Sequence, residues 1–280
     1  MDNFVFIYVL LSILDVTFSD HHRPGNYLNH DRTVVNCAKF KREVNQHSCV
    51  LSPFNTEGPY FLSSDLLRSD ITDGQVGLPL KLTIKLINSN DCNPLENMYV
   101  HVWQSNALGV YSGVELFPKS LPIIGPEGPF GPNGPGGFGQ LNNGGPGDNG
   151  MADLGRPASI NNERFGRGYQ ISDSNGQVTF ETIVPGWYTG RCLHMHVEVF
   201  HKNTTEKNEI TYVGQIFFDP KLTDQLKLVN SYSSNNQPLT LNEDDWVYKN
   251  HGNETLLNLI DNGNSFSGSI TFGINPDLIS

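Results

Sequence analysis

The sequence has few positive charges and little that could enter a membrane. It carries 18 Lys and Arg residues against 29 Asp and Glu residues, a formal net charge of −11. Because a phosphate backbone is bound by a basic surface, nucleic acid is excluded as an expected partner. The apolar run at residues 4–14 is too short to cross a bilayer, so no membrane association is expected of the mature chain.

That apolar run has the character of a secretory signal peptide. Thr17 and Ser19 place small residues at the −3 and −1 positions of a cleavage site. The segment before the run has Asp2 and no Lys or Arg, whereas signal peptides usually begin with positive charge. The alternative is a buried N-terminal strand. We predict that residues 1–19 are a signal peptide and that the protein is secreted and extracellular.

An extracellular location changes how the cysteines are interpreted, because disulfides persist there. The four cysteines allow three pairings, and a bond between the first two, which closes a short loop, is the expected one. Asn203 in "NTT" and Asn253 in "NET" are acceptor sites for N-glycosylation and agree with export. The four cysteines are Cys37, Cys49, Cys92 and Cys192.

Helical periodicity is scarce, and short segments that alternate apolar and polar residues dominate. Turn residues separate these segments, which is typical of an antiparallel sandwich or barrel. We predict a mainly β fold, an antiparallel two-sheet β-sandwich with long loops and few short helices, the best helix candidate being residues 220–229. The predicted strands are "LKLTIKLIN" (80–88), "MYVHVWQSN" (98–106), "QVTFETIV" (177–184), "LHMHVEVF" (193–200), "TYVGQIFF" (211–218) and "GSITFGI" (268–274).

One domain accounts for most of the chain. A polar N-terminal arm is expected over residues 20–54 and the sandwich over residues 55–280. A Gly/Pro-rich insert at residues 125–150 has glycine at every third position over part of its length, but four triplets are too few for a collagen helix. We expect a surface loop there, either a lid or interaction loop near a site or an inert excursion.

The segment "PGWYTGRCLHMH" (185–196) gathers the candidate chemistry. Strand alternation puts His194 and His196 on one face, where they could bind one metal ion or simply pack as structural histidines. The turn sequence "PGWYTG" can fold Tyr188 back toward them. A phenolate is a hard anionic donor suited to ferric iron. Arg191 could stabilise an anionic substrate or form a structural ion pair.

Zinc is the competing metal, since zinc hydrolases combine histidines with a carboxylate or a cysteine. Glu198 lies on the same face of the predicted strand as the two histidines, two residues beyond the second one. A zinc site would leave Tyr188 and Arg191 without roles, so the zinc interpretation is possible but less favoured.

Four blocks of sequence extend this pattern over most of residues 55–220. With them, the chain resembles the intradiol ring-cleavage dioxygenases, in which such blocks follow one another in the same order. The resemblance is greatest to the secreted single-domain type of fungi and plant-feeding mites, related to catechol 1,2-dioxygenase and protocatechuate 3,4-dioxygenase. The blocks are "EGPYFL" (57–62), "VHVWQSNALGVYSG" (100–113), "SDSNGQVTFETIVPGWYTGRCLHMHVEVF" (172–200) and "VGQIFF" (213–218).

The resemblance implies a non-haem Fe(III) enzyme that cleaves the ring of catechols or plant polyphenols with O2 to give cis,cis-muconate-type products. It also implies a monomer, because the helical dimerisation domain of the cytosolic catechol enzymes is missing. The interval of 77 residues between the two tyrosine ligands is longer than usual in the family. The implied metal ligands are Tyr111, Tyr188, His194 and His196, and the implied catalytic residues are Tyr188, Arg191 and Gln215.

A function of another class stays open: a secreted non-catalytic β-sandwich module that binds phenolic ligands or a partner protein. It predicts a protein without iron, whereas the dioxygenase hypothesis predicts Fe(III) as the cofactor.

Overall fold

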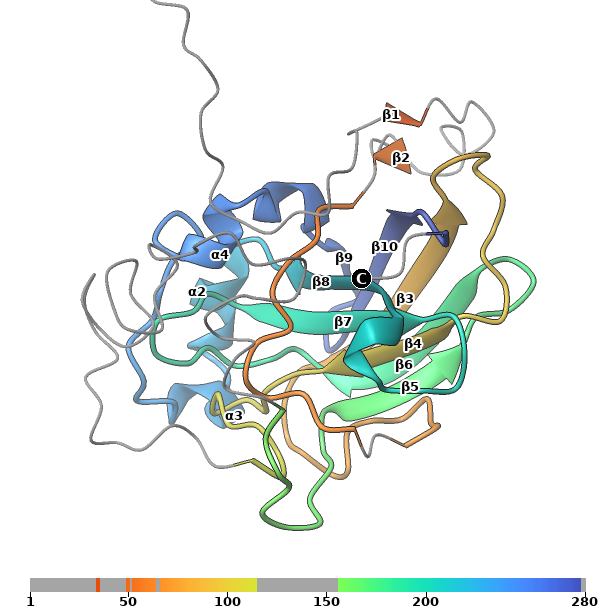
Figure 1. The fold of residues 1–280 in the computed structure, drawn as a ribbon. Coiled ribbons are helices and arrows are strands. Elements are labelled where there is room, and N and C mark those ends of the chain that lie inside the picture. The colour runs from red at the N-terminus through yellow and green to blue at the C-terminus, as the bar shows by residue number, and fades with distance from the viewer. Residues whose placement is uncertain (1–33, 36–48, 51, 64–65, 115–155, 278–280) are drawn as a thin grey trace, which may run out of the picture.

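Two four-stranded sheets form the body of the protein (Figure 1). The computed structural model describes residues 34–35, 49–50, 52–63, 66–114 and 156–277. The predicted signal peptide and the Gly/Pro-rich insert lie outside these residues. One sheet has the order β6–β3–β10–β9 and the other β5–β4–β7–β8. The strands are β3 (Pro79–Asn88), β4 (Tyr99–Trp103), β5 (Arg167–Ile171), β6 (Gln177–Ile183), β7 (His194–Phe200), β8 (Ile210–Phe217), β9 (Asn258–Asp261) and β10 (Phe266–Ile274), with a separate antiparallel pair of β1 (Val34–Val35) and β2 (Cys49–Val50).

The prediction of a mainly β, two-sheet sandwich is confirmed, with one correction. The first and last long strands, β3 and β10, pair in parallel, with Leu80 opposite Phe266 and Asn88 opposite Ile274. Parallel neighbours need a long connection, and nearly the whole domain lies between these two strands. Apolar and polar residues alternate in the same way in parallel and antiparallel strands. The sequence pattern therefore does not show in which direction two strands pair.

The core lies between the sheets and follows from this alternation. Strand β3 buries every second residue from Leu80 to Leu86. These side chains join a single apolar cluster with Val100 of β4, Val197 of β7 and Phe272 of β10. Full burial of one such side chain stabilises the fold by about 1.5–3 kcal/mol. The cluster therefore fixes the two sheets face to face and gives the site on β7 a rigid base.

The region after β8 contains short helices. The predicted helix at residues 220–229 is shorter in the structure, where α2 (Lys221–Leu226) buries Leu222 and Leu226. The helices α3 (Asn230–Ser233) and α4 (Trp246–Lys249) and the 3-10 turns η3 (Lys207–Glu209) and η4 (Gly252–Thr255) were not predicted. Among the described residues, no helix has the length and apolar character of a membrane span.

The expected disulfide between Cys37 and Cys49 is wrong. Cys92 is disulfide-bonded, and Cys192 is a buried free thiol. With four cysteines in the chain, the bond of Cys92 uses one of the other two, so these cannot pair with each other. Loop length alone favoured the short loop, but pairing depends on which chain segments the fold brings together.

Candidate metal centre

The two histidines lie side by side in the middle of the second sheet. All seven residues of β7 are buried, and the ring centroids of His194 and His196 are 4.9 Å apart. In the sheet, His196 is opposite Trp103 of β4 and Gln215 of β8. The Trp103 indole stacks on the His196 imidazole at 4.8 Å with an interplanar angle of 7°. This packing holds the imidazole in one orientation.

Tyr188 reaches the histidines because its turn folds back onto the start of β7. The Arg191 backbone N–H donates to the Tyr188 carbonyl at 3.1 Å, and Gly190 between them has a φ of 84°. The Tyr188 hydroxyl is 3.1 Å from His194 Nε2. On the other side of that ring, Nδ1 is 2.7 Å from the Cys192 carbonyl. A carbonyl can only accept, so Nδ1 carries the proton and the Nε2 lone pair faces Tyr188.

Tyr111 comes from the loop after β4 and completes the group. Its ring centroid is 5.7 Å from that of Tyr188 and 6.1 Å from that of His196. The loop packs directly on the Tyr188 turn at Gly109, which has a φ of +74°. A Cβ atom at Gly109 would overlap the Trp187 carbonyl oxygen. The absence of a side chain at this glycine therefore allows the two tyrosines to approach each other.

Unsatisfied polar atoms mark the centre of this group. Within the part of the chain that the structure describes, the buried Tyr111 hydroxyl and both ring nitrogens of His196 have no hydrogen-bond partner. An unsatisfied buried polar atom costs about 1–3 kcal/mol, and a bound ion would satisfy the Tyr111 oxygen and one of the two His196 nitrogens. Two phenol oxygens and two imidazole nitrogens are a donor set of hard oxygen and borderline nitrogen, which suits ferric iron. The residues fit the implied metal.

The protonation states agree with this use. Burial holds the pKa values of His194 and His196 well below the usual histidine value, so both imidazoles are neutral, as metal ligands must be. Burial raises the pKa of Tyr188 to about 12, although the Arg191 guanidinium opposes the rise. Burial also raises the pKa of Tyr111. Both phenols therefore keep their protons in the metal-free protein and would release them to a metal.

Arg191 and Gln215 lie together at this centre. Arg191 Nη2 donates to Gln215 Oε1 at 2.6 Å, and Gln215 Nε2 donates to the Thr56 carbonyl at 3.1 Å. On its other edge, Arg191 Nε donates to Asp245 Oδ2 at 2.8 Å. The side chain of Arg191 is 11% exposed, so its charge is fixed in place and only slightly screened by water.

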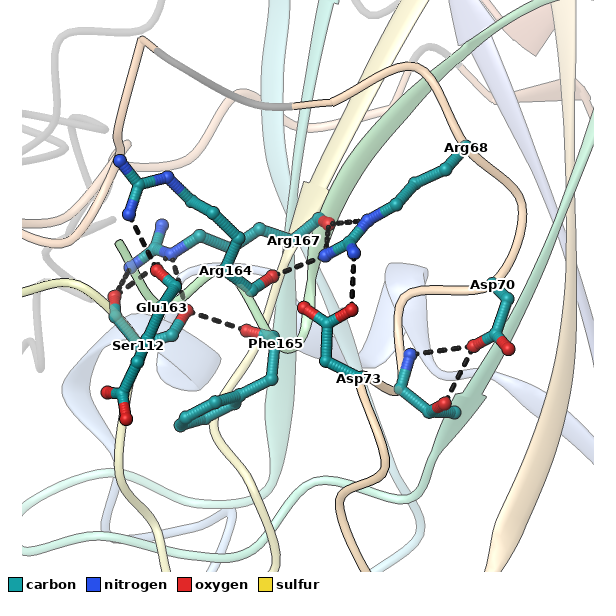
Figure 2. Close-up of polar contacts among 9 residues, drawn as sticks. Arg68, Asp70, Asp73, Ser112, Glu163, Arg164, Phe165 and Arg167 are labelled. Carbon is teal, nitrogen blue, oxygen red and sulfur yellow. Dashed lines mark hydrogen bonds and ion pairs between the residues drawn. The ribbon is translucent and has the colours of Figure 1, made fainter. Parts of the chain in front are cut away.

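Arg167 supports the segment that carries Tyr111, and sequence reasoning did not single it out. Figure 2 shows this buried guanidinium against Ser112, the residue after Tyr111. Its Nε and Nη2 donate to the Ser112 carbonyl at 3.1 and 2.9 Å, and its Nη1 donates to the Tyr60 carbonyl at 2.6 Å. The Tyr60 ring stacks on that of Tyr111 at 4.6 Å. One buried cation thus fixes the segments that carry Tyr60 and Tyr111.

The carboxylate considered for zinc is engaged elsewhere. Glu198 is fully buried and pairs with Arg156, whose Nη2 is 3.3 Å from Glu198 Oε2. Arg156 also donates from Nε to Glu57 at 2.6 Å. No group of three or more His, Cys, Asp or Glu side chains within the described segments could hold a metal ion. The tyrosine and histidine set is therefore the better-supported metal centre.

Residues from distant parts of the chain support the site, and no sequence motif indicated Asp245 or Arg167. Asp245 is 54 residues beyond Arg191, and Tyr60 and Arg167 are 107 residues apart. Asp245, in "EDDW", precedes a helix too short to have a recognisable period. The only signal for Tyr60 was its place in the "EGPYFL" block.

Comparisons with known proteins agree with the motifs. No protein-family model and no curated protein matches the chain. An intradiol ring-cleavage dioxygenase from Tetranychus urticae is similar in structure, with a TM-score of 0.65 and 28% identity over 83% of this chain and 98% of that one. A second dioxygenase structure has a TM-score of 0.64 at 28% identity, with the same coverage. The dioxygenase domain of a carbohydrate-binding fusion from Streptomyces sp. SirexAA-E gives a TM-score of 0.47 at 20% identity, over 80% of this chain and 97% of that one. The first two structures confirm the resemblance to intradiol dioxygenases.

Proposed function

We propose that this protein, a structural relative of the intradiol ring-cleavage dioxygenases, is itself a non-haem Fe(III) enzyme of that kind. It would open the ring of catechols or plant polyphenols with O2 and yield cis,cis-muconate-type products. The observation that carries the proposal is the convergence of two phenols and two neutral imidazoles, with unsatisfied donor atoms at their centre. The fixed charge of Arg191 beside Gln215 is the second element that such a reaction needs.

Tyr111, Tyr188, His194 and His196 would hold the iron. When bound, Fe(III) supplies a strong Lewis acid that favours the catechol dianion and activates its ring toward O2. The imidazoles are neutral without any further adjustment because burial lowers their pKa values. Their orientation is set in advance, at His194 by the Cys192 carbonyl and at His196 by the Trp103 indole.

The two tyrosines have different roles in this proposal. Tyr111 is 2% exposed and held between Tyr60 and Arg167, so it stays in place. Tyr188 is only partly buried and lies on a turn. This more accessible position is why we assign to Tyr188 Oη the proton that leaves a substrate hydroxyl.

Arg191 and Gln215 would face the charge that develops on the bound catecholate. A guanidinium held from two sides cannot turn away as this charge grows, which is the condition for electrostatic stabilisation. Loss of one such preorganised donor typically slows an enzyme by about 10²- to 10³-fold.

Export and subunit state are further parts of the proposal. The disulfide at Cys92 supports an oxidising compartment and thus the extracellular location implied by residues 1–19. We propose that the secreted protein acts as a monomer on environmental or plant phenolics, with catechol, protocatechuate, caffeate and larger polyphenols as candidate substrates.

Oxygen uptake on the iron-reconstituted protein tests the function. A panel of catechols is supplied, and mass analysis of the products is expected to show both oxygen atoms added with ring opening. Tyrosinate bound to ferric iron absorbs broadly in the visible, so the protein should be coloured. Tyr188→Phe should change the colour and abolish turnover. Tyr169→Phe, at a tyrosine that stacks on His101 away from the site, should change neither.

The alternative binding module makes the opposite prediction. A protein that stays colourless and iron-free after ferric reconstitution, yet binds phenolic ligands, would exclude the enzyme. Turnover and colour that survive Tyr188→Phe would instead exclude this residue as a ligand.

A further inference from the structure

A buried carboxylate in the region after β8, that of Asp245, contacts two residues that neighbour the candidate metal ligands. Asp245 has no exposed surface and stands at the start of α4. Its Oδ1 accepts from the backbone N–H groups of Val247 and Tyr248 at 2.7 and 3.2 Å. Its Oδ2 accepts from Arg191 Nε and from the Cys192 N–H, both at 2.8 Å. One oxygen therefore fixes the carboxylate to its own helix, and the other reaches the site.

The first contact governs Arg191. With Asp245 on its Nε edge and Gln215 on its Nη2, the guanidinium is held from two sides. The Trp246 ring centroid lies 5.9 Å from its Cζ. Without the carboxylate, the long side chain would regain rotamers that turn toward solvent, and the hydrogen bond to Gln215 would no longer be fixed.

The second contact reaches a candidate metal ligand. The Cys192 peptide donates to Asp245 through its N–H, and the Cys192 carbonyl accepts from His194 Nδ1 at 2.7 Å. A carboxylate fixing the residue two positions before the imidazole thus helps to set both the tautomer and the ring orientation of His194. Partners beyond the direct ligands commonly tune metal sites in this way.

We propose that Asp245 is the positioning residue of this centre, which orients Arg191 toward Gln215 and steadies His194 through the Cys192 peptide. The consequence for turnover rests on the proposed dioxygenase function, whereas the positioning itself does not. The region after α2 would then be part of the site as well as a cover for the sandwich.

Asp245→Asn is the discriminating variant. An asparagine can keep Oδ1 on the helix start, but its NH2 group replaces Oδ2 and cannot accept from Arg191 or Cys192. Asn242→Ala is the matched control, because Asn242 is 5% exposed in the same segment. Its side-chain amide donates to the Phe218 carbonyl at 3.0 Å, so this substitution removes a buried hydrogen bond that does not involve Arg191.

Two measurements are made on each protein. In the metal-free protein, the Arg191 Nε–H signal in a ¹H–¹⁵N spectrum should exchange slowly with water in the wild type and in Asn242→Ala, and rapidly in Asp245→Asn. In the iron-loaded protein, Asp245→Asn should lower kcat for a catechol by about 10- to 100-fold with KM changed less than about threefold. Asn242→Ala should stay within about threefold in both.

The proposal is overturned if Asp245→Asn keeps a protected Nε–H signal, if it turns over at the wild-type rate, or if Asn242→Ala is slowed as much. If Asp245→Asn does not fold, Arg191→Lys tests the same contact from its other partner. A lysine cannot contact Asp245 and Gln215 together as the forked guanidinium of Arg191 does, so wild-type turnover by that variant also overturns the proposal. A wild-type protein that consumes no catechol refutes the proposed function, and the spectra of the metal-free proteins then decide the positioning role alone.

Discussion

Gly109→Ala should separate the two tyrosine-bearing segments and thereby damage the site as well as the fold. Gly109 has a φ of +74°, and a Cβ atom there would overlap the Trp187 carbonyl oxygen. Trp187 precedes Tyr188, so a shift of this backbone moves a candidate ligand. The expected result is loss of stability together with loss of iron.

The magnitude follows from two contributions. An L-residue in the left-handed region costs about 1–2 kcal/mol, and relief of an overlap in a packed site costs about 1–3 kcal/mol more. Gly109→Ala should therefore lower the free energy of unfolding by about 2–5 kcal/mol. Gly74 is the matched control: it has a φ of +72°, and among the described residues nothing lies within 4 Å of where a Cβ atom would stand. Gly74→Ala should cost only the backbone part, about 1–2 kcal/mol.

Urea denaturation of the metal-free proteins measures both values, and metal analysis after ferric reconstitution measures iron content. Gly74→Ala should bind iron as the wild type does, and Gly109→Ala should bind less. Equal destabilisation by the two substitutions, with equal iron content, would refute the argument that contact between the Tyr111 loop and the Tyr188 turn assembles the site.

Two further substitutions test the supports of the fold. Arg167→Met should lower the free energy of unfolding by about 2–6 kcal/mol, because the buried Ser112 and Tyr60 carbonyls lose their donor at about 1–3 kcal/mol each. Arg164→Met, in the same segment but more exposed, should cost less than about 1 kcal/mol. Equal losses in thermal melts of the two variants would contradict the role of Arg167. Asp70 accepts from the backbone and side chain of Thr72, which lowers the pKa of its carboxyl group. A carboxyl group whose pKa is lowered in the folded state stabilises the protein at pH values above its unfolded pKa, and this stabilisation is lost as pH falls through its folded pKa. The melting temperature of Asp70→Ala should therefore lie below that of the wild type by a constant amount from pH 6 to 8, and the difference should shrink below about pH 4. A difference that grows in acid would contradict this role of Asp70.

The parts of this site that sequence reasoning could predict are the local ones. Alternation along one strand places His194 and His196 on the same face, and a glycine-containing turn returns Tyr188 to them, so three side chains follow from neighbouring residues. Tyr111 does not follow in this way, because its loop meets the turn only through tertiary packing. Its position became predictable through the resemblance of its motif to that of a family.

Local sequence patterns could not predict that β3 and β10 pair in parallel, nor the role of Asp245, and the physical reason is the same for both. Each depends on where a distant segment packs, and neither leaves a period or a motif in its own stretch of sequence. A buried carboxylate is costly unless it is paired and hydrogen-bonded. Asp245 accepts hydrogen bonds from four donors. Two of them are backbone N–H groups of α4, and the other two belong to Arg191 and Cys192, just before His194. If Asp245 left its position, the Arg191 guanidinium would lose its carboxylate partner and the start of α4 would lose its cap. The stability of the C-terminal region and the geometry of the metal centre are for this reason expected to change together.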